Sequence, residues 1–365
     1  MFNVDFNKTK TLLEVAQSAT KADIIRAIDS QRLDFEDFAV LFSPQMDKAL
    51  LKKLAQRSME LTRKRFGRAI SLYIPLYYDN RCTNGCIYCG FNAKSDIVRK
   101  TLTFEEIVRE ADVIRKSKFK NILLLAGEHP ESAEIGHLTK VIKKLHKMDF
   151  SCISIEIAPL EEEAYKALVD DSHLDGMAVY QETYNPEIYD QVHAFGRKKN
   201  YEYRLATPER AARAGVPKIS VGFLMGLNNF KQEAINLAQH LDYLQKYHWQ
   251  SEYSLSFPRI RDAAGIRDEF ETVENFDFIR TVCAFRLFFN ETGMSLSTRE
   301  FPEFRDYILP LGFTNTSAGS STAPGGYTKD SYDSEQFHIE DPRTPVEITK
   351  VLKKRGFDPV WKDWE

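Results

Sequence analysis

Short apolar segments of strand length recur along this chain, and segments of helix length separate them. From residue 70 onward eight can be counted, at residues 70–77, 121–125, 152–157, 176–180, 218–223, 252–256, 294–297 and 312–315. Strands that alternate with helices build a parallel sheet, because parallel neighbours need a crossover connection. Eight is the number of strands that closes a (β/α)8 barrel. We therefore predict an α/β protein built on a (β/α)8 barrel of the TIM type.

An open, doubly wound sheet is the alternative architecture for the same alternation. When such a sheet binds a dinucleotide, a glycine-rich turn follows its first strand. The chain carries Cys82, Cys86 and Cys89 at that position instead. The pattern after the first strand therefore favours the barrel.

The segments on either side of the predicted barrel have a different texture. Residues before Gly67 read as helices, with Thr20 to Asp23 as one helix start. We predict an N-terminal helical extension at 1–68, the barrel at 69–320, and a C-terminal extension at 321–365 that closes on the barrel. The small residues at 317–327 follow the eighth strand directly, which is typical of a functional loop.

The charge balance argues against two classes of partner. The chain has 50 Lys and Arg residues against 53 Asp and Glu residues, a net charge of -3. Such a balance gives no strong field for nucleic acid or for an anionic membrane. No run of about 18 apolar residues is present, and the N-terminal residues do not resemble a signal peptide. We expect a soluble cytoplasmic protein.

Three of the five cysteines lie within eight residues, as Cys82-x3-Cys86-x2-Cys89. Three thiolates on one loop can hold a four-iron cluster and leave its fourth iron open to another ligand. A zinc site would need a fourth Cys or His at a paired spacing, and none lies nearby. We predict a [4Fe-4S] cluster held by these three cysteines.

This spacing, with Tyr88 before the last cysteine, resembles the cluster loop of the radical S-adenosylmethionine (SAM) enzymes. The resemblance implies that SAM binds the open iron through its amino and carboxylate groups. It also implies an external one-electron reductant and a 5′-deoxyadenosyl radical.

Polar side chains follow the predicted strands, where the active site of such a barrel lies. Glu156 is the most informative of them, because it is an acid within an apolar strand, where an unpaired charge is costly. A salt bridge inside the barrel and a hydrogen bond to a bound cofactor both explain it.

The resemblance also implies roles for individual residues in binding SAM. Gly127 and Glu128 resemble the loop that binds the methionine amino group, and Arg204 resembles an arginine that holds the methionine carboxylate. Residues 222–226 resemble the adenine-contacting segment. The predicted cofactor contacts are Tyr88, Gly127, Glu128, Glu156, Glu182, Arg204, Gly222 and Met225.

Longer strings narrow the resemblance to the tyrosine lyases of this superfamily. They lie at residues 180–184, 256–259, 295–300, 324–327 and 360–364, and the similarity extends over nearly the whole chain. The resemblance implies cleavage of the Cα–Cβ bond of L-tyrosine to 2-iminoacetate and p-cresol, with 5′-deoxyadenosine and methionine as further products. It also implies a role in thiazole formation for thiamine biosynthesis and a complex with the thiazole synthase ThiG.

Arg299 is the predicted anchor of the tyrosine carboxylate, with Ser297 and Thr298 beside it, because an arginine fork suits a carboxylate. Arg259 and Ser317 are further candidates, and a salt bridge to Glu300 or to another acid at the mouth of the barrel is the alternative role for Arg299.

Three other functions remain possible from the sequence: the hydrogenase-maturation tyrosine lyase, a deazaflavin-forming enzyme, and an iron–sulfur electron carrier. A carrier normally holds its cluster with four cysteines. Three cysteines combined with Glu156, Arg204 and Arg299 therefore favour an enzyme.

Overall fold

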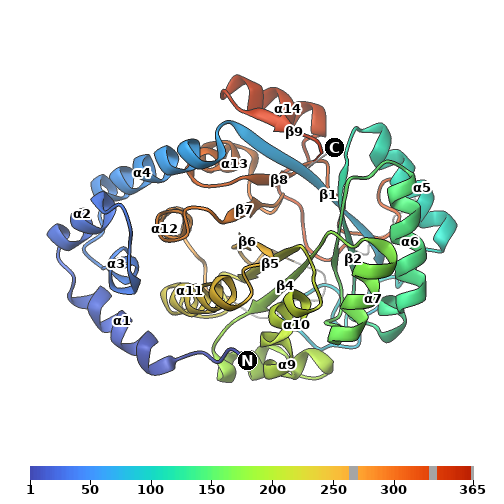
Figure 1. Ribbon diagram of the computed structural model, residues 1–365, viewed down its shortest axis with the longest axis horizontal. Helices are drawn as coiled ribbons and strands as arrows, with labels where there is room; N and C mark the ends of the chain where they lie inside the picture. Colours follow the sequence, from blue (N-terminus) through green and yellow to red (C-terminus); the bar gives the residue numbers. More distant parts are fainter. Residues whose placement is uncertain (263–269, 329–334, 363–365) are drawn as a thin grey trace.

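The computed structural model describes residues 1–262, 270–328 and 335–362. Its centre is a closed ring of parallel strands (Figure 1). They are β1 (Ala69–Asp79), β2 (Asn121–Ala126), β3 (Cys152–Glu156), β4 (Gly176–Glu182), β5 (Lys218–Phe223), β6 (Glu252–Ser256), β7 (Gly293–Leu296) and β8 (Asn315–Ser317). Each strand pairs in parallel with the next, and β1 pairs with both β8 and β2. The predicted (β/α)8 barrel is confirmed.

The eighth strand lies later in the sequence than predicted. Residues 309–311 form a 3-10 helix, η3 (Leu309–Leu311), and β8 begins only at Asn315. The predicted strand at 312–315 therefore shares a single residue with the observed one. Gly312 and Phe313 belong to the connection that precedes β8. Phe313 is buried although it is not in a strand, and its apolar side chain led to the wrong prediction.

A ninth strand, β9 (Asp358–Val360), was not predicted. It adds to β1 in parallel, opposite Ala69 to Ser71, and the exposed ion pair Arg68 Nε–Asp358 Oδ2 of 2.8 Å lies beside this contact. The end of the string at 360–364, from residue 363 on, lies outside the described residues.

Four helices precede the barrel: α1 (Phe6–Ser18), α2 (Lys21–Asp29), α3 (Phe35–Val40) and α4 (Lys48–Phe66). Thr20 and Asp23 cap α2 reciprocally, as predicted, and Gly67 follows α4. These helices lie along α11 and α12 on one side of the barrel (Figure 1). The contact is specific, because Thr9 Oγ1 donates a hydrogen bond of 2.6 Å to Asn236 Oδ1. The division of the chain at residues 68 and 320 stays a prediction.

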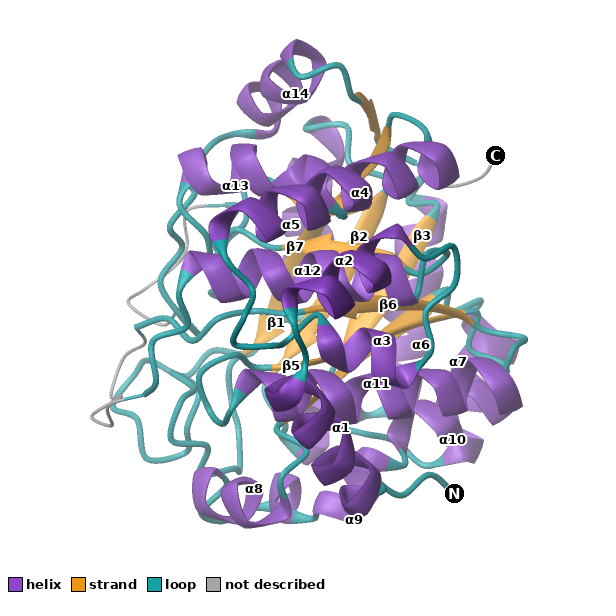
Figure 2. Cartoon of the chain, turned by 90° about the vertical axis from the view of Figure 1, so that its left-hand side faces the viewer, coloured by secondary structure: helices purple, strands orange, loops and turns teal. Residues whose placement is uncertain are grey.

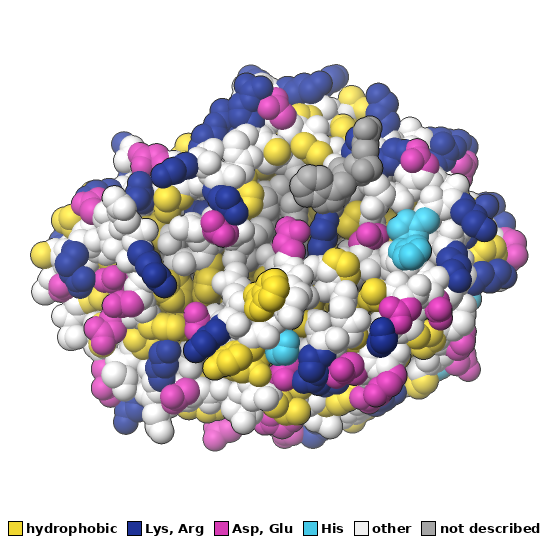
Figure 3. Space-filling model, viewed as in Figure 1, with side chains coloured by type: hydrophobic (Ala, Val, Ile, Leu, Met, Phe, Trp, Pro, Cys, Tyr) yellow, Lys and Arg dark blue, Asp and Glu magenta, His cyan; other side chains and the backbone are white. Residues whose placement is uncertain are grey.

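The remaining helices surround the strands (Figure 2). They are α5 (Phe104–Lys116), α6 (Ile135–Lys147), α7 (Glu162–Ser172), α8 (Pro186–Val192), α9 (Tyr201–Leu205), α10 (Thr207–Arg213), α11 (Phe230–Tyr247), α12 (Asn275–Phe288), α13 (Pro302–Ile308) and α14 (Pro345–Lys354), with 3-10 helices η1 (Pro130–Ala133) and η2 (Arg197–Lys199). None of the helices that the structure describes is long and apolar enough to span a membrane. Basic and acidic side chains are interspersed over the face shown in Figure 3.

The amino end of the barrel interior is hollow. A cavity of about 530 Å³ lies there, and hydroxyl and amide side chains from several strands line it: Ser71, Asn121, Ser154, Ser220, Ser254, Ser295 and Asn315. In most barrels of this type, bulky branched residues fill the interior. Tyr73 and Tyr180 line both this cavity and a second one at the carboxyl end, so they form a floor between the two.

Candidate active site

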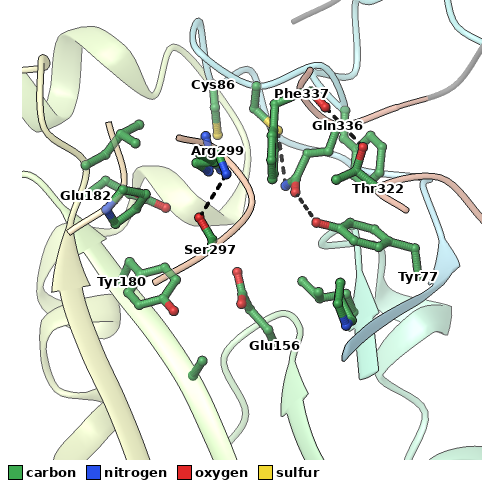
Figure 4. Close-up of a pocket in the computed structure, with 18 of the residues that line it drawn as sticks. Tyr77, Cys86, Glu156, Tyr180, Glu182, Ser297, Arg299, Thr322, Gln336 and Phe337 are labelled. Atoms are coloured by element: carbon green, nitrogen blue, oxygen red, sulfur yellow. Dashed lines mark hydrogen bonds between the residues drawn. The ribbon is translucent and has the colours of Figure 1, made fainter. Parts of the chain in front are cut away.

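A cavity of about 170 Å³ opens at the carboxyl ends of the strands (Figure 4). It brings together residues that are far apart in the sequence. Most residues predicted for the site line it: Cys82, Cys86, Tyr88, Cys89, Gly127, Glu128, Glu156, Glu182, Arg204, Ser297, Thr298, Arg299 and Ser317. Arg259, Gly222 and Met225 do not.

The three cysteines lie on the loop that follows β1, and all three are free thiols. Arg99 orders this loop by donating hydrogen bonds to the backbone carbonyls of Asn80, Phe91, Asn92 and Ser95. These hydrogen bonds hold the loop in the conformation that directs its three thiols into the cavity. The sequence gives no indication of them, because their acceptors are backbone carbonyls.

The donor set fits a four-iron cluster. Burial raises the pKa of all three thiols, so a metal that binds them must displace protons. No group of three side chains in the described residues is placed to hold a single metal ion. Thiolates that each bind a different iron of one cluster have no need to converge on a single point.

A buried network of alternating charge lies beside the cysteines. Arg204 Nη1 is 2.7 Å from Glu128 Oε1, and Arg204 Nη2 is 3.8 Å from Glu182 Oε1. Lys198 Nζ is 2.8 Å from the same oxygen of Glu182, and Asn84 Nδ2 donates to Glu128 Oε2 at 2.9 Å. Although burial opposes it, the two cations hold the pKa of Glu128 below its ordinary value. The network therefore offers both a cation, Arg204, and an anion, Glu128, to a zwitterionic ligand.

Glu182 is held in an uncommon backbone conformation. Its φ is +69°, and the pairing of β4 with β5 shifts register at this residue. A residue other than glycine in this region costs about 1–3 kcal/mol, and such residues cluster at functional sites. The shift turns the Glu182 carboxylate towards Lys198 and Arg204.

Arg299, in the loop after β7, and Glu156, at the end of β3, point into the same cavity (Figure 4). The ring of Phe337 stacks on the Arg299 guanidinium, with 3.4 Å from Cζ to the ring centroid. Within the described ranges, no carboxylate lies within 4.0 Å of this guanidinium. Burial lowers its pKa. The alternative of a salt bridge to Glu300 is wrong, because Glu300 pairs with Arg259 and Arg261.

Glu156 likewise has no ion pair among the residues that the structure describes. Burial, together with the nearby Glu182, raises its pKa from 4.5 to about 7. The interpretation of Glu156 as half of a salt bridge is therefore not supported, and its carboxylate faces the cavity.

Three predicted site residues lie elsewhere. Arg259 pairs with Glu300 through two hydrogen bonds and donates to the carbonyl of Val273 at 2.8 Å. Its guanidinium therefore joins the loop after β6 to the loop after β7 and is not directed into the cavity. Gly222 lies in the barrel wall, where a Cβ would come 2.0 Å from the carbonyl oxygen of Ser256. Met225 is buried, and Leu224 lines the cavity in its place.

Several cavity residues were not predicted: Tyr77, Asn84, Lys198, Arg261, Thr322, Gln336 and Phe337. Lys198 lies in a run of three basic residues, Arg197 to Lys199, which reads as a solvated surface. Gln336 and Phe337 belong to the C-terminal extension and reach the cavity only through the tertiary fold. No signal in the sequence distinguishes them.

Comparisons with known proteins agree with this geometry. Residues 77–241 match the Radical SAM superfamily, and residues 256–358 match the Biotin and Thiamin Synthesis associated domain. The 2-iminoacetate synthases of Salmonella typhimurium and Escherichia coli are each 42% identical to the chain over 347 residues, which cover 95% of this chain and 91% of theirs.

Solved structures show the same relationship. A crystal structure of HydG, a maturase of the [FeFe]-hydrogenase, has a TM-score of 0.93 and 32% identity, and covers 98% of this chain and 80% of that chain. Methylornithine synthase (PylB), at 18% identity and a TM-score of 0.77, shares the fold over 93% of this chain and 97% of its own.

These matches confirm that the chain is a radical SAM enzyme, with a [4Fe-4S] cluster and SAM as its cofactors. The chain belongs to the 2-iminoacetate synthase family of the radical SAM superfamily.

Proposed function

We propose that this protein cleaves the Cα–Cβ bond of L-tyrosine, releasing 2-iminoacetate and p-cresol for thiazole formation in thiamine biosynthesis. Family membership supports this reaction. The observation that carries it is Arg299, a cation that faces the cavity and forms no ion pair within the described part of the chain. A buried cation without a partner is costly. A ligand carboxylate would provide that partner.

The charge network is suited to the amino-acid end of SAM. Glu128 can accept from its amino group, and Arg204 can donate to its carboxylate. Without ligand these two side chains neutralise one another at 2.7 Å. Binding would therefore exchange one buried ion pair for two and would strand neither charge. When bound, the cluster and SAM supply the radical that removes a hydrogen atom from the substrate.

Tyrosine would lie with its carboxylate on Arg299. Ser297, Thr298 and Ser317 line the same wall and can contribute hydroxyl donors. Phe337 limits the movement of the guanidinium by stacking on it. Positioning of this kind is required because the reacting hydrogen must be held close to the radical.

Glu156 is a further ionisable group that lines the cavity. With a pKa of about 7, it can accept a hydrogen bond or a proton at neutral pH. The sequence assigned it to the cofactor. Its position opposite Arg299 in the cavity is compatible with contact to either ligand (Figure 4).

Anaerobic incubation with tyrosine, SAM and a one-electron reductant tests the proposal. We expect p-cresol and 5′-deoxyadenosine in equal amounts, with 2-iminoacetate recovered as glyoxylate and ammonia. Formation of 5′-deoxyadenosine without p-cresol would show a radical SAM enzyme with a different substrate.

The structural similarity to HydG makes that maturase the second candidate. The two remaining cysteines, Cys152 on β3 and Cys283 on α12, are both buried and lie outside the cluster loop. They offer no ligand set for a second cluster. We therefore expect about four irons per chain, the content of one four-iron cluster. A reaction that continues to cyanide or carbon monoxide would favour the maturase.

Three further parts of the proposal concern the surroundings of the enzyme. A thiazole synthase, ThiG, is the proposed recipient of 2-iminoacetate, because this product hydrolyses if it is not captured. The match to a domain associated with biotin and thiamin synthesis is consistent with that role. An external one-electron reductant and a cytoplasmic location complete the proposal, since the cluster needs electrons and a reducing compartment.

A further inference from the structure

One short segment of the C-terminal extension, residues 335–337, lies directly on the cluster loop. The backbone N–H of Gly90 donates to the carbonyl oxygen of Gln336 at 3.0 Å. A Cβ at Gly90 would come 2.6 Å from that oxygen and 2.8 Å from the carbonyl oxygen of Glu335. The glycine that follows Cys89 therefore permits a contact that any other residue would prevent. The N–H of Gln336 donates to the carbonyl of Thr322 at 3.2 Å, which holds the segment from the other side.

The Gln336 side chain reaches a predicted cluster ligand (Figure 4). Its Nε2 lies 3.7 Å from Cys89 Sγ and donates to it. The hydroxyl of Tyr77 donates to Gln336 Oε1 at 2.8 Å. This second hydrogen bond orients the amide. Its oxygen faces the Tyr77 hydroxyl on β1, so its NH2 group faces the sulfur of Cys89.

An N–H group directed at a ligating sulfur affects the electronics of an iron–sulfur cluster. Reduction potentials of such clusters depend on hydrogen bonds to their sulfurs, on burial and on charge. When the cluster takes one electron from an external reductant, negative charge on its thiolates increases. A hydrogen bond to Cys89 then becomes stronger, and it stabilises the reduced form more than the oxidised form.

We propose that Gln336 is a positioning residue for the cluster, and that its N–H···S hydrogen bond to Cys89 raises the reduction potential of the cluster. The inference rests on the proposed ligation by Cys82, Cys86 and Cys89, and it is independent of which substrate is cleaved. The same segment carries Phe337, which stacks on Arg299, so the contact to the cluster and the contact to the substrate anchor lie on adjacent residues.

The test replaces the amide and leaves the backbone contacts intact. Gln336→Leu removes the donor. Gln336→Glu keeps the shape and the acceptor for Tyr77 but places a carboxylate beside the thiolate. The anaerobically reconstituted enzyme is titrated with dithionite without SAM, and the reduced cluster is followed by electron paramagnetic resonance.

In Gln336→Leu we expect the ratio of oxidised to reduced cluster at a fixed potential to rise about tenfold, a shift of about 59 mV to more negative potential for a one-electron couple. Gln336→Glu should shift at least as far. Gln245→Leu is the matched control, because the Gln245 amide donates to Thr292 and does not line the cavity. Iron content is measured first, and about four irons per chain shows that ligation is intact. An unchanged midpoint in an iron-replete Gln336→Leu variant would overturn the inference.

A measurement on the unmutated protein does not depend on how the variants fold. With glutamine labelled by ¹⁵N, electron–nuclear spectroscopy of the reduced cluster should detect a weak nitrogen coupling that disappears in Gln336→Glu. Absence of that coupling in the parent protein would also refute the hydrogen bond. If the potential shifts as expected but no p-cresol forms, the proposed substrate is wrong and the role of Gln336 stands. A parent protein that binds no four-iron cluster would overturn both.

Discussion

Replacing Glu156 with glutamine should stabilise the protein at neutral pH while impairing its activity. The carboxyl ionises near pH 7 in the folded protein, against an ordinary value of 4.5. Between these values the folded state binds more protons than the unfolded state, so stability falls as pH rises from about 4.5 to about 7. At about 1.4 kcal/mol per pKa unit, this loss reaches at most ~3 kcal/mol. Glu156 is only half-buried, so we expect a smaller effect of about 1–2 kcal/mol.

Urea unfolding of Glu156→Gln and of the parent protein at several pH values measures this effect. The variant should gain little at pH 5 and should gain most above pH 7. Asp341→Asn is a control with the opposite sign. Although burial opposes it, the hydrogen bonds from Arg343 and Arg305 hold the pKa of Asp341 below its ordinary value, so its replacement should destabilise the protein at pH 7. The reasoning fails if Glu156→Gln is no more stable than the parent at pH 8.

The other predictions concern the cluster, the substrate anchor and the barrel. Cys86→Ala should lose bound iron and 5′-deoxyadenosine formation, whereas Cys152→Ala should retain both; full activity of Cys86→Ala would refute the ligand assignment. Arg299→Lys should raise the KM for tyrosine about tenfold, because lysine lacks the planar fork, and should leave the affinity for SAM unchanged. If steady-state kinetics instead show a weaker affinity for SAM and an unchanged KM for tyrosine, the assignment of Arg299 to tyrosine and Arg204 to SAM is wrong. Arg305→Met should cost about 3 kcal/mol in urea unfolding, because it leaves the buried Asp341 without one of its two arginines; a loss below 1 kcal/mol would show that Arg343 compensates.

The sequence predicted the barrel because its evidence is periodic. Each strand is a short apolar run, and the helices between them have the length of a crossover. The eighth strand was misplaced where this evidence is weakest, since Phe313 is buried in a connection and β8 itself, Asn315–Ser317, contains no apolar residue. The short β9 was missed because three residues that include Pro359 give no periodic signal.

The site was predicted where the residues stand at the ends of strands. Glu156 could be selected because a charge within an apolar strand is unusual, and Arg299 because it lies in a string that resembles the tyrosine lyases and an arginine suits a carboxylate. Arg259 follows a strand in the same way, yet its guanidinium turns to Glu300, and the sequence gives no indication of that choice. Lys198 was missed because it lies in a run of basic residues that resembles an exposed surface. Gln336 was missed because it lies far along the sequence from the other cavity residues. Only the three-dimensional arrangement identifies either of them.

The contact between β9 and β1 has a consequence for how the chain folds. The ion pair beside it joins residues 290 positions apart, and Gln336 contacts Cys89 across 247 positions. Contacts of such high sequence separation require a long loop to close before they form, which slows folding. During synthesis, β1 and the cysteines are therefore complete long before the segments that cover them arrive. The contact of β9 at the amino end of β1 and the contact of residues 335–337 at its carboxyl end form only after nearly all of the described chain has been made.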